Sequence, residues 1–106
     1  MGLTFKENCP DHRNTRVIDL VKSFKDFNCN VDVYDPWVDK NQANHEYGIQ
    51  LIDKPVKGNY DAIIIAVGHD DFKELTEDQF RAFGKDNHVL YDVKYLLKAN
   101  ESDGRL

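Results

Sequence analysis

The chain has 106 residues, of which 41% are hydrophobic and 31% charged, enough for one globular domain with a single core. Its formal net charge of -5 excludes general binding to nucleic acid, which requires a basic face. No apolar run approaches the ~20 residues that span a bilayer, and the N-terminus has no signal-peptide pattern. Two scattered cysteines provide neither a disulfide framework nor a zinc site, so we expect a cytoplasmic protein with no membrane or nucleic-acid partner.

The first segment, residues 2–5, is short and apolar, and we interpret it as the end of a buried strand whose beginning is truncated. Lys6 follows at once, and a polar loop then leads to Arg13 and the start of a helix. In an open α/β sheet, ligands bind outside the carboxyl ends of the strands. A lysine at a strand end and an arginine near a helix N-terminus therefore favour a phosphate group at this corner.

Residues 16–27 have the clearest helical pattern in the chain, with apolar side chains at helical spacing and charged ones on the opposite face. Asp11, Asn14 or Thr15 can cap the start of this helix. We therefore expect the polar loop to lead directly into it.

The middle of the chain continues the alternation of strand and helix. A second strand is expected over residues 31–34, ended by Asp35-Pro36 because proline cannot continue a ladder. Residues 37–47 are interpreted as a loop and a short helix that Gly48 stops, and residues 49–52 as a brief strand.

The most hydrophobic run is residues 62–67, which is β-branched and does not alternate with polar residues. This composition is typical of a central parallel strand that is covered on both faces. Helical segments are expected over residues 72–83, stopped by Gly84, and a last strand over residues 89–93, ended by Lys94.

The alternation predicts a small doubly wound, Rossmann-like three-layer α/β sandwich with a mainly parallel sheet. We expect a single domain over residues 1–106, because no linker divides the chain. Its last ten residues, 97–106, are polar and are expected to form a flexible, poorly packed tail.

Several blocks of the sequence resemble the C-terminal, UDP-binding domain of the UDP-glucose/GDP-mannose dehydrogenase family. The family signature has Gly, then Phe-Lys, then Asp-x-Arg-x-Ser/Thr, and residues 2–15 match it at this spacing. Residues 31–36, 60–67 and 91–94 also look like their family counterparts and occur in the right order. The wording Glu-Asn-Cys-Pro-Asp resembles most closely the bacterial enzymes that oxidise UDP-N-acetylhexosamines for capsule or O-antigen synthesis.

The resemblance implies that the chain is one part of a larger enzyme. Such enzymes oxidise the 6-hydroxyl of a UDP-sugar, UDP-N-acetylhexosamine or UDP-glucose, to a carboxylate in two NAD⁺-dependent steps. They have an N-terminal NAD-binding Rossmann domain, a central helical domain that dimerises, and a C-terminal domain that holds the nucleotide of the sugar donor. The family's catalytic cysteine lies upstream of this domain, so we expect no catalytic residue here and no activity from this chain alone.

The resemblance assigns four residues. Phe5 and Lys6 match positions that contact the UDP-sugar, and Arg13 matches a residue that reaches the NAD pyrophosphate across the cleft. Lys94 stands where some relatives have a substrate-binding arginine, and it keeps the charge but not the bidentate fork. The alternative for Lys6 and Arg13 is a solvated ion pair, which contributes only ~0–1 kcal/mol. The alternative for Phe5 is packing in the core.

Other polar or aromatic residues at strand ends have structural interpretations that we favour. Asp35 stands where a dinucleotide fold has a ribose-binding acid, but no Gly-x-Gly-x-x-Gly turn precedes it, which favours a turn residue. His69 can reach a ligand at the end of the central strand, yet a structural hydrogen bond to the following turn is favoured. Trp37 is expected to pack rather than to stack on a base. Asp70-Asp71 is interpreted as the acidic start of a helix, and we expect no metal site.

Two other classes of function compete with a UDP-sugar-binding domain. A receiver-like signalling domain is also a small α/β sandwich, but it needs a phosphoacceptor Asp at the carboxyl end of its third strand. Here Asp61 begins that strand, which ends at Val67-Gly68-His69, so the acceptor is missing. The third class is a free-standing fragment that serves assembly and has no ligand affinity.

Overall fold

A computed structural model of the chain describes residues 1–4, 7–8 and 16–105, and the statements below refer to these residues. The helices and strands follow in the order α1 (Val17–Asp26), α2 (Lys40–Tyr47), β1 (Tyr60–Ile65), α3 (Asp70–Lys73), α4 (Glu77–Arg81), β2 (Gly84–Asp92), the 3₁₀ helix η1 (Ala99–Glu101) and β3 (Gly104–Arg105).

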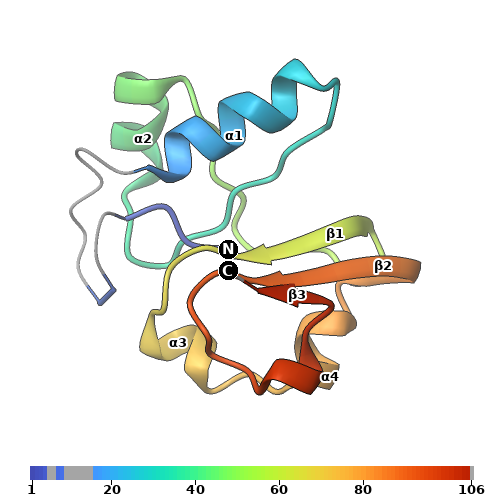
Figure 1. Cartoon of the computed structure of the whole chain (residues 1–106). Coiled ribbons are helices and arrows are strands. Elements are labelled where there is room, and N and C mark those ends of the chain that lie inside the picture. Colours follow the sequence, from blue (N-terminus) through green and yellow to red (C-terminus); the bar gives the residue numbers. More distant parts are fainter. Residues whose placement is uncertain (5–6, 9–15, 106) are drawn as a thin grey trace.

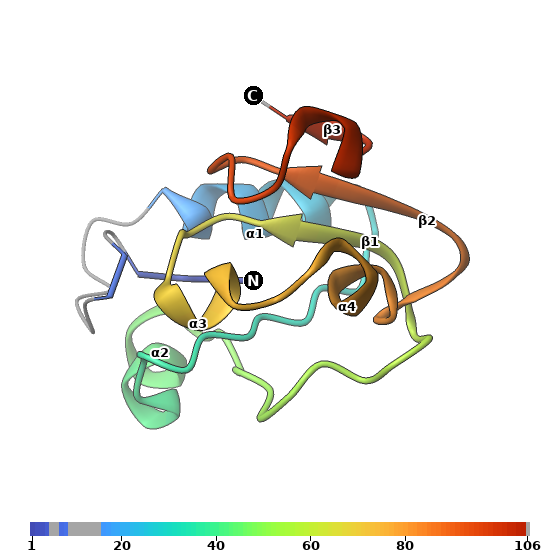
Figure 2. The ribbon, with the colours of Figure 1, turned by 90° about the horizontal axis from the view of Figure 1, so that it is seen from below.

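The described strands form one parallel sheet with the order β1-β2-β3. Helices α1 and α2 lie on one side of it, and α3 and α4 lie on the other (Figure 1). A view from below shows α3 and α4 in front of β1 and α1 behind it (Figure 2). The predicted doubly wound, parallel α/β architecture is therefore confirmed.

Strand β1 is covered more completely on one face than on the other. Ile63 and Ile65 are buried against the α3–α4 side, whereas Ala62 is exposed and Ile64 is half-buried. The gap under α1 contains a cavity of about 640 Å³ that Ala62 and Ile64 help to line. The prediction of a strand covered on both faces is thus correct for one face only, because α1 does not close over the other.

The predicted strand over residues 2–5 is represented by single hydrogen bonds in its described part. The carbonyl of Met1 accepts a bond of 2.9 Å from the amide of Ala66, and the amide of Gly2 donates to the carbonyl of Tyr34 at 2.8 Å. Residues 1–2 therefore lie between residue 34 and the chain that leaves β1, in the place of a sheet strand.

The predicted strands over residues 31–34 and 49–52 are reduced to one parallel bridge between Val33 and Leu51. The amide of Ile52 donates to the carbonyl of Val33 at 2.9 Å. The sheet is therefore extended beyond β1 by these early segments, which are joined by isolated hydrogen-bonded pairs and not by a regular ladder.

Two apolar clusters form the core, one for each side of the sheet. The first joins α1 and α2 to the early segments, and the second lies under α3 and α4. The first contains Leu3, Ile18, Val21, Val33, Val38, Ala43, Ile49 and Leu51; the second contains Ile63, Ile65, Phe72, Phe80 and Leu90.

Local sequence signals explain the short helices. Asp39 caps α2, since its carboxylate accepts the amides of Asn41 and Gln42, and Gly48 ends α2 in the left-handed conformation, as predicted. The predicted helical segments over 72–83 are two short helices, because Thr76 starts α4 with a capping box. Among the described residues, no helix is long and apolar enough to cross a bilayer.

The end of the chain is packed, contrary to the expected loose tail. Residues 97–105 include η1 and β3, and β3 pairs with Tyr91 and its neighbour at the end of β2. The guanidinium of Arg81 donates to both carboxylate oxygens of Asp103 at 3.0 and 3.2 Å, and the amide of Leu90 donates to the same carboxylate at 2.8 Å. A single acidic side chain therefore ties this polar segment to α4 and β2.

Candidate functional site

The carboxyl ends of the strands meet at one edge of the molecule. The arrowheads of β1 and β2 point to this edge, and α1 begins over it (Figure 1). Thr4, Asp35, His69 and Lys94 each follow a segment that ends here. This is the edge at which open α/β sheets bind their ligands.

A cavity of about 320 Å³ opens at this edge, beside the first residue of α1. Its lining includes the buried residue Val67 and, at exposed positions that form its rim, Arg16, Lys94 and Glu7. Two cations beside the positive end of a helix dipole suit an anionic ligand such as a phosphate. Thr4 and Glu7, which line the cavity, flank the predicted ligand residues Phe5 and Lys6 in the sequence.

Arg16 is a residue of this cavity that the sequence pattern does not single out, because it falls on the polar face of its helix. Its guanidinium lies 3.6 Å from the carboxylate of Asp19, and both side chains are largely exposed. Such an exposed pair is worth only ~0–1 kcal/mol, so it would not hold Arg16 away from a ligand. The useful signal is its position next to the helix start, three residues after Arg13.

A buried aspartate positions Lys94. The carboxylate of Asp92 accepts the amide of Lys94 at 3.1 Å and the amide of Leu97 at 2.9 Å. The turn lies against the end of β1, where a Cβ on Gly68 would come within 3.3 Å of Leu96 and 3.9 Å of the Cβ of Lys94. Lys94 thus lies on the lining of the cavity, as a residue at this strand end should.

A second aspartate, Asp35, is buried at the same edge and has four hydrogen-bond partners. Its Oδ2 accepts the amides of Leu3 at 2.6 Å and Thr4 at 3.2 Å and lies 2.9 Å from Nε2 of His69. Its Oδ1 accepts the amide of Trp37 at 2.8 Å, the bond of an Asx turn. The turn interpretation of Asp35 is correct but incomplete, because the carboxylate also joins three chain segments.

The imidazole of His69 is fully buried, and both of its nitrogens are occupied. Nδ1 lies 2.8 Å from the backbone amide of Asn8, which can only donate, so Nδ1 is the acceptor and Nε2 carries the proton. Nε2–H is directed to Asp35, with Oγ1 of Thr4 at 3.2 Å. His69 has the structural role we favoured, but the partners of its ring lie in distant segments, and only its backbone carbonyl accepts amides of the following turn.

Trp37 covers this pair, as the packing interpretation predicts. Its ring stacks on His69 with centroids 5.9 Å apart and planes at 27°, and its Nε1–H donates to Asp71 at 3.0 Å. The predicted ligand residues Phe5, Lys6 and Arg13 lie outside the described part of the chain. The predicted caps Asp11, Asn14 and Thr15 lie outside it as well.

The chain is similar to known proteins over nearly its whole length. Residues 1–99 match the model of the UDP-glucose/GDP-mannose dehydrogenase family, UDP binding domain. The chain is 55% identical over 106 residues to the UDP-N-acetyl-D-glucosamine 6-dehydrogenases of Salmonella typhi and of Pseudomonas aeruginosa. Each match covers 100% of this chain and 25% of the relative.

A more distant relative is Protein CapL of Staphylococcus aureus, 40% identical over 101 residues, which are 95% of this chain and 24% of that protein. The chain thus spans about a quarter of the length of the curated relatives it matches. Because the family model covers almost the whole sequence, the chain belongs to the UDP-glucose/GDP-mannose dehydrogenase family, as a UDP-binding domain.

Proposed function

We propose that this chain holds the UDP part of a UDP-sugar within an NAD-dependent enzyme that oxidises the sugar C6 hydroxyl to a carboxylate. The observation that carries the proposal is the cavity at the carboxyl ends of the strands, with Lys94 and Arg16 on its rim beside the start of α1. A UDP-N-acetylhexosamine is the favoured donor, since two relatives with 55% identity are named for UDP-N-acetyl-D-glucosamine. UDP-glucose is the second candidate, and capsule or O-antigen synthesis in the cytoplasm is the proposed setting.

In this proposal the cationic residues make different contacts with the ligand. Lys94 and Lys6 act as point charges on the diphosphate, and Phe5 contacts the nucleotide sugar. Arg16 adds a planar donor at the mouth of the cavity, which suits bidentate binding of a phosphate. Glu7 on the same rim opposes excess anionic charge, which favours a diphosphate over a more highly charged ligand.

In the described part of the chain, the residue at the position of a ribose-binding acid is already occupied by protein groups. The acid that would bind a nicotinamide nucleotide's ribose is Asp35, and both of its oxygens are already hydrogen bonded to Leu3, Thr4, Trp37 and His69. We therefore assign NAD to the N-terminal domain of the parent enzyme, with its central domain completing the cleft. Arg13 supplies a peripheral contact to the NAD pyrophosphate.

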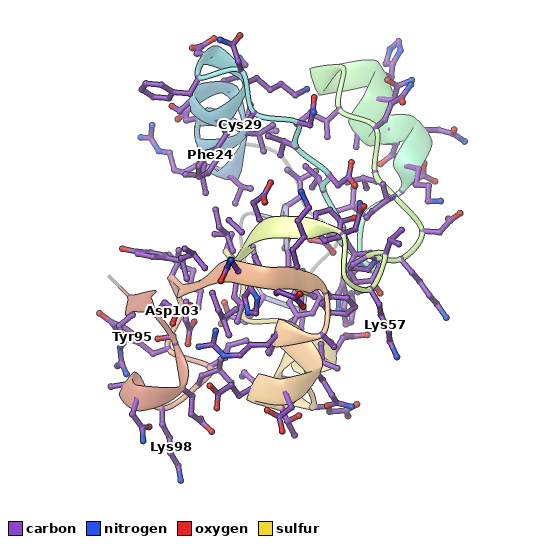
Figure 3. All side chains as sticks on the ribbon, turned by 90° about the vertical axis from the view of Figure 1, so that its right-hand side faces the viewer. Phe24, Cys29, Lys57, Tyr95, Lys98 and Asp103 are labelled. Carbon is purple, nitrogen blue, oxygen red and sulfur yellow. The ribbon has the colours of Figure 1, made fainter. Side chains whose placement is uncertain are left out.

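The same proposal implies that this chain does not turn over by itself. Cys29 is exposed and follows the C-terminal end of α1 (Figure 3), whereas the cavity is lined by residues at the start of this helix. A ten-residue helix is about 15 Å long, so this thiol does not reach the ligand. With UDP-sugar and NAD⁺ added to the chain, we expect no NADH, and NADH formation would refute this assignment.

Titration of UDP into the chain tests the function. We expect saturable binding that uridine does not show, because the phosphates provide most of the attraction. Lys94→Ala and Arg16→Ala should each weaken UDP binding by about tenfold, the loss of one charge-assisted hydrogen bond. Lys57→Ala is the matched control, since it removes the same charge at an exposed position on the outer rim of the molecule (Figure 3).

The outcomes separate the competing classes of function. Equal binding of uridine and UDP, or equal losses in all three variants, would contradict a phosphate site in the cavity. An absence of any binding would favour a fragment that serves assembly. Phosphorylation of the chain by acetyl phosphate would favour a receiver-like domain.

A further inference from the structure

We propose that the buried Asp35–His69 pair is a positioning device for UDP: it holds Thr4 and Asn8 so that the Thr4–Glu7 side of the cavity has the right shape. The inference rests on the proposed function, because it concerns the same cavity. It assigns a role in ligand binding to two residues that do not line the cavity themselves.

The pair accepts hydrogen bonds from backbone amides that lie before and after residues 5–7 in the sequence. Before them, Oδ2 of Asp35 accepts the amides of Leu3 and Thr4 at 2.6 and 3.2 Å. After them, Nδ1 of His69 accepts the amide of Asn8 at 2.8 Å. Because Asp35 and His69 are joined at 2.9 Å, the two anchor points form one continuous hydrogen-bonded unit.

Asn8 also makes a hydrogen bond through its own side chain. Its backbone has a φ of 54°, and its side-chain Oδ1 accepts the amide of Asp70 at 2.8 Å, at the start of α3. Asparagine adopts the left-handed conformation more readily than most residues, so this position suits a sharp turn that must also bond to a helix. Asn8 is thus fixed to the start of α3 by both its backbone and its side chain.

Burial makes this unit sensitive to loss of any member. The imidazole is fully buried and the carboxylate side chain is fully buried as well. Removing one partner in such a place leaves a charge or a donor without compensation, which costs far more than an exposed bond. The pair cannot act directly on a ligand, because every ring nitrogen and carboxylate oxygen already has a protein partner.

Two substitutions at His69 each remove one of its two hydrogen bonds and keep the other. His69→Asn places an amide oxygen near the position of Nδ1, so it can still accept the amide of Asn8 but loses the donor to Asp35. His69→Gln places an amide nitrogen near the position of Nε2, so it can still donate to Asp35 but loses the acceptor for Asn8. We expect both variants to weaken UDP binding by about tenfold, the equivalent of one buried hydrogen bond.

Hydrogen exchange provides the readout that links binding to position. In His69→Gln the amide of Asn8 should exchange at least about tenfold faster, whereas in His69→Asn the amides of Leu3 and Thr4 should show the larger change. Phe80→Leu is the control for a general loss of stability, since Phe80 is buried in the other core cluster, away from the cavity. It should lower the midpoint of unfolding and leave the dissociation constant for UDP unchanged.

The results decide between positioning and plain stability. The proposal is overturned if both His69 variants bind UDP as the unchanged chain does, or if Phe80→Leu weakens binding equally. If the His69 variants do not fold, two measurements on the unchanged chain decide. A protonated Nδ1 in the ¹⁵N chemical shifts of His69, or rapid exchange of the Asn8 amide, would refute the hydrogen bond from Asn8 to His69 and with it the positioning role. If UDP does not bind at all, the proposed function fails, while the exchange and ¹⁵N data still test the anchoring.

Discussion

Strands β1, β2 and β3 in residues 60–105 form a parallel ladder, whereas residues 1–52 join the same sheet through single hydrogen bonds and one isolated bridge. In the first case β1 pairs with β2 over four consecutive residues beyond a register shift near Tyr60, and β3 pairs with the last two residues of β2. In the second, distant groups such as the carboxylate of Asp35 provide the contacts. The two regions show that a doubly wound sheet can be continued either by local pairing or by a few buried polar side chains.

Packing follows the same division. The cluster under α3 and α4 contains Ile65, Phe72, Phe80 and Leu90, which are all 0–1% exposed. On the other side, the cavity of about 640 Å³ separates α1 from β1. Because this cavity leaves the face of β1 under α1 incompletely filled, we expect the early segments to open at lower free energy than the ladder.

The substitution with the largest expected effect on stability is Gly2→Ala, in the early segments. Gly2 has a φ of +98°, and an added Cβ would lie 2.5 Å from Cβ and 2.9 Å from the backbone nitrogen of Val67. Neither neighbour is the end of a flexible side chain, so the backbone between residue 34 and β1 must shift. We expect a loss of about 3 kcal/mol or more in the free energy of unfolding, measured by chemical denaturation.

Gly58→Ala is the control for this prediction. Gly58 also has a positive φ, +69°, but a Cβ there would meet nothing within 4 Å. Its cost should be the conformational strain alone, about 1 kcal/mol. Equal losses at Gly2 and Gly58 would show that contact with Val67 is unimportant.

Asp35→Asn tests whether a polar group replaces the missing ladder in the early segments. If the amide nitrogen takes the place of Oδ2, it faces donors from Leu3, Thr4 and His69, and with either orientation the charge is lost. We expect a loss of about 2–3 kcal/mol, because buried donors lose their acceptor. Asp86→Asn, at an exposed position in β2, should change the free energy of unfolding by less than about 0.5 kcal/mol.

Hydrogen exchange makes the comparison sharper. In Asp35→Asn, the amides of residues 2–4, 33–35 and 37–38 should lose protection, while those of the β1–β2 ladder keep theirs until global unfolding. Uniform loss of protection would show that the two regions unfold as one unit and would contradict the division.

The next effect is a dependence on pH that arises at the N-terminal amino group. The amine of Met1 donates to the carbonyl of Ile64 at 2.7 Å, and burial lowers its pKa from 8.0 to about 6 against the smaller, opposing effect of Asp35. Between pH 8 and pH 6 the unfolded chain binds more protons, so stability falls as the pH is lowered. The loss should approach about 2 kcal/mol in a chain that begins at Met1.

Acetylation of the amine is the control, since it removes the charge and the titration. The acetylated chain should show a flatter profile between pH 6 and pH 8. An unchanged slope would assign the pH dependence to other groups.

The regular part of the fold could be predicted from the sequence, and the irregular part could not. The apolar run at Ile63–Ile65 and the capping signals at Asp39 and Gly48 are local, so periodicity and residue type reveal them. The pairing of Asp35 with His69 joins residues 34 positions apart, and no local pattern encodes which distant donor fills an acceptor.

The candidate site divides in the same way. Lys94 is recognisable through the family resemblance, and the structure places it on the cavity lining. Arg16 is not recognisable, because a charged residue on the polar side of a helix is ordinary and only the fold shows that it faces the strand ends. The packed end of the chain was not predicted for a related reason: Asp103 is hydrogen bonded to Arg81, which is distant in the sequence, and no local pattern indicates this pair.

The smallest expected effect belongs to the ladder side, where Arg81 and Asp103 join the end of the chain to α4. The hydrogen bond from Arg81, followed by that from the amide of Leu90, lowers the pKa of Asp103 below its usual value. A lowered folded-state pKa gives stability that is present above the unfolded pKa and is lost as the pH falls through the folded value. Because the carboxylate is 41% exposed, solvent screening limits the contribution to less than about 1 kcal/mol. Asp103→Asn should therefore flatten the acid limb of the stability profile slightly and increase exchange only at Leu90 and β3; a loss as large as that of Asp35→Asn would mean that the ladder, too, depends on one polar side chain.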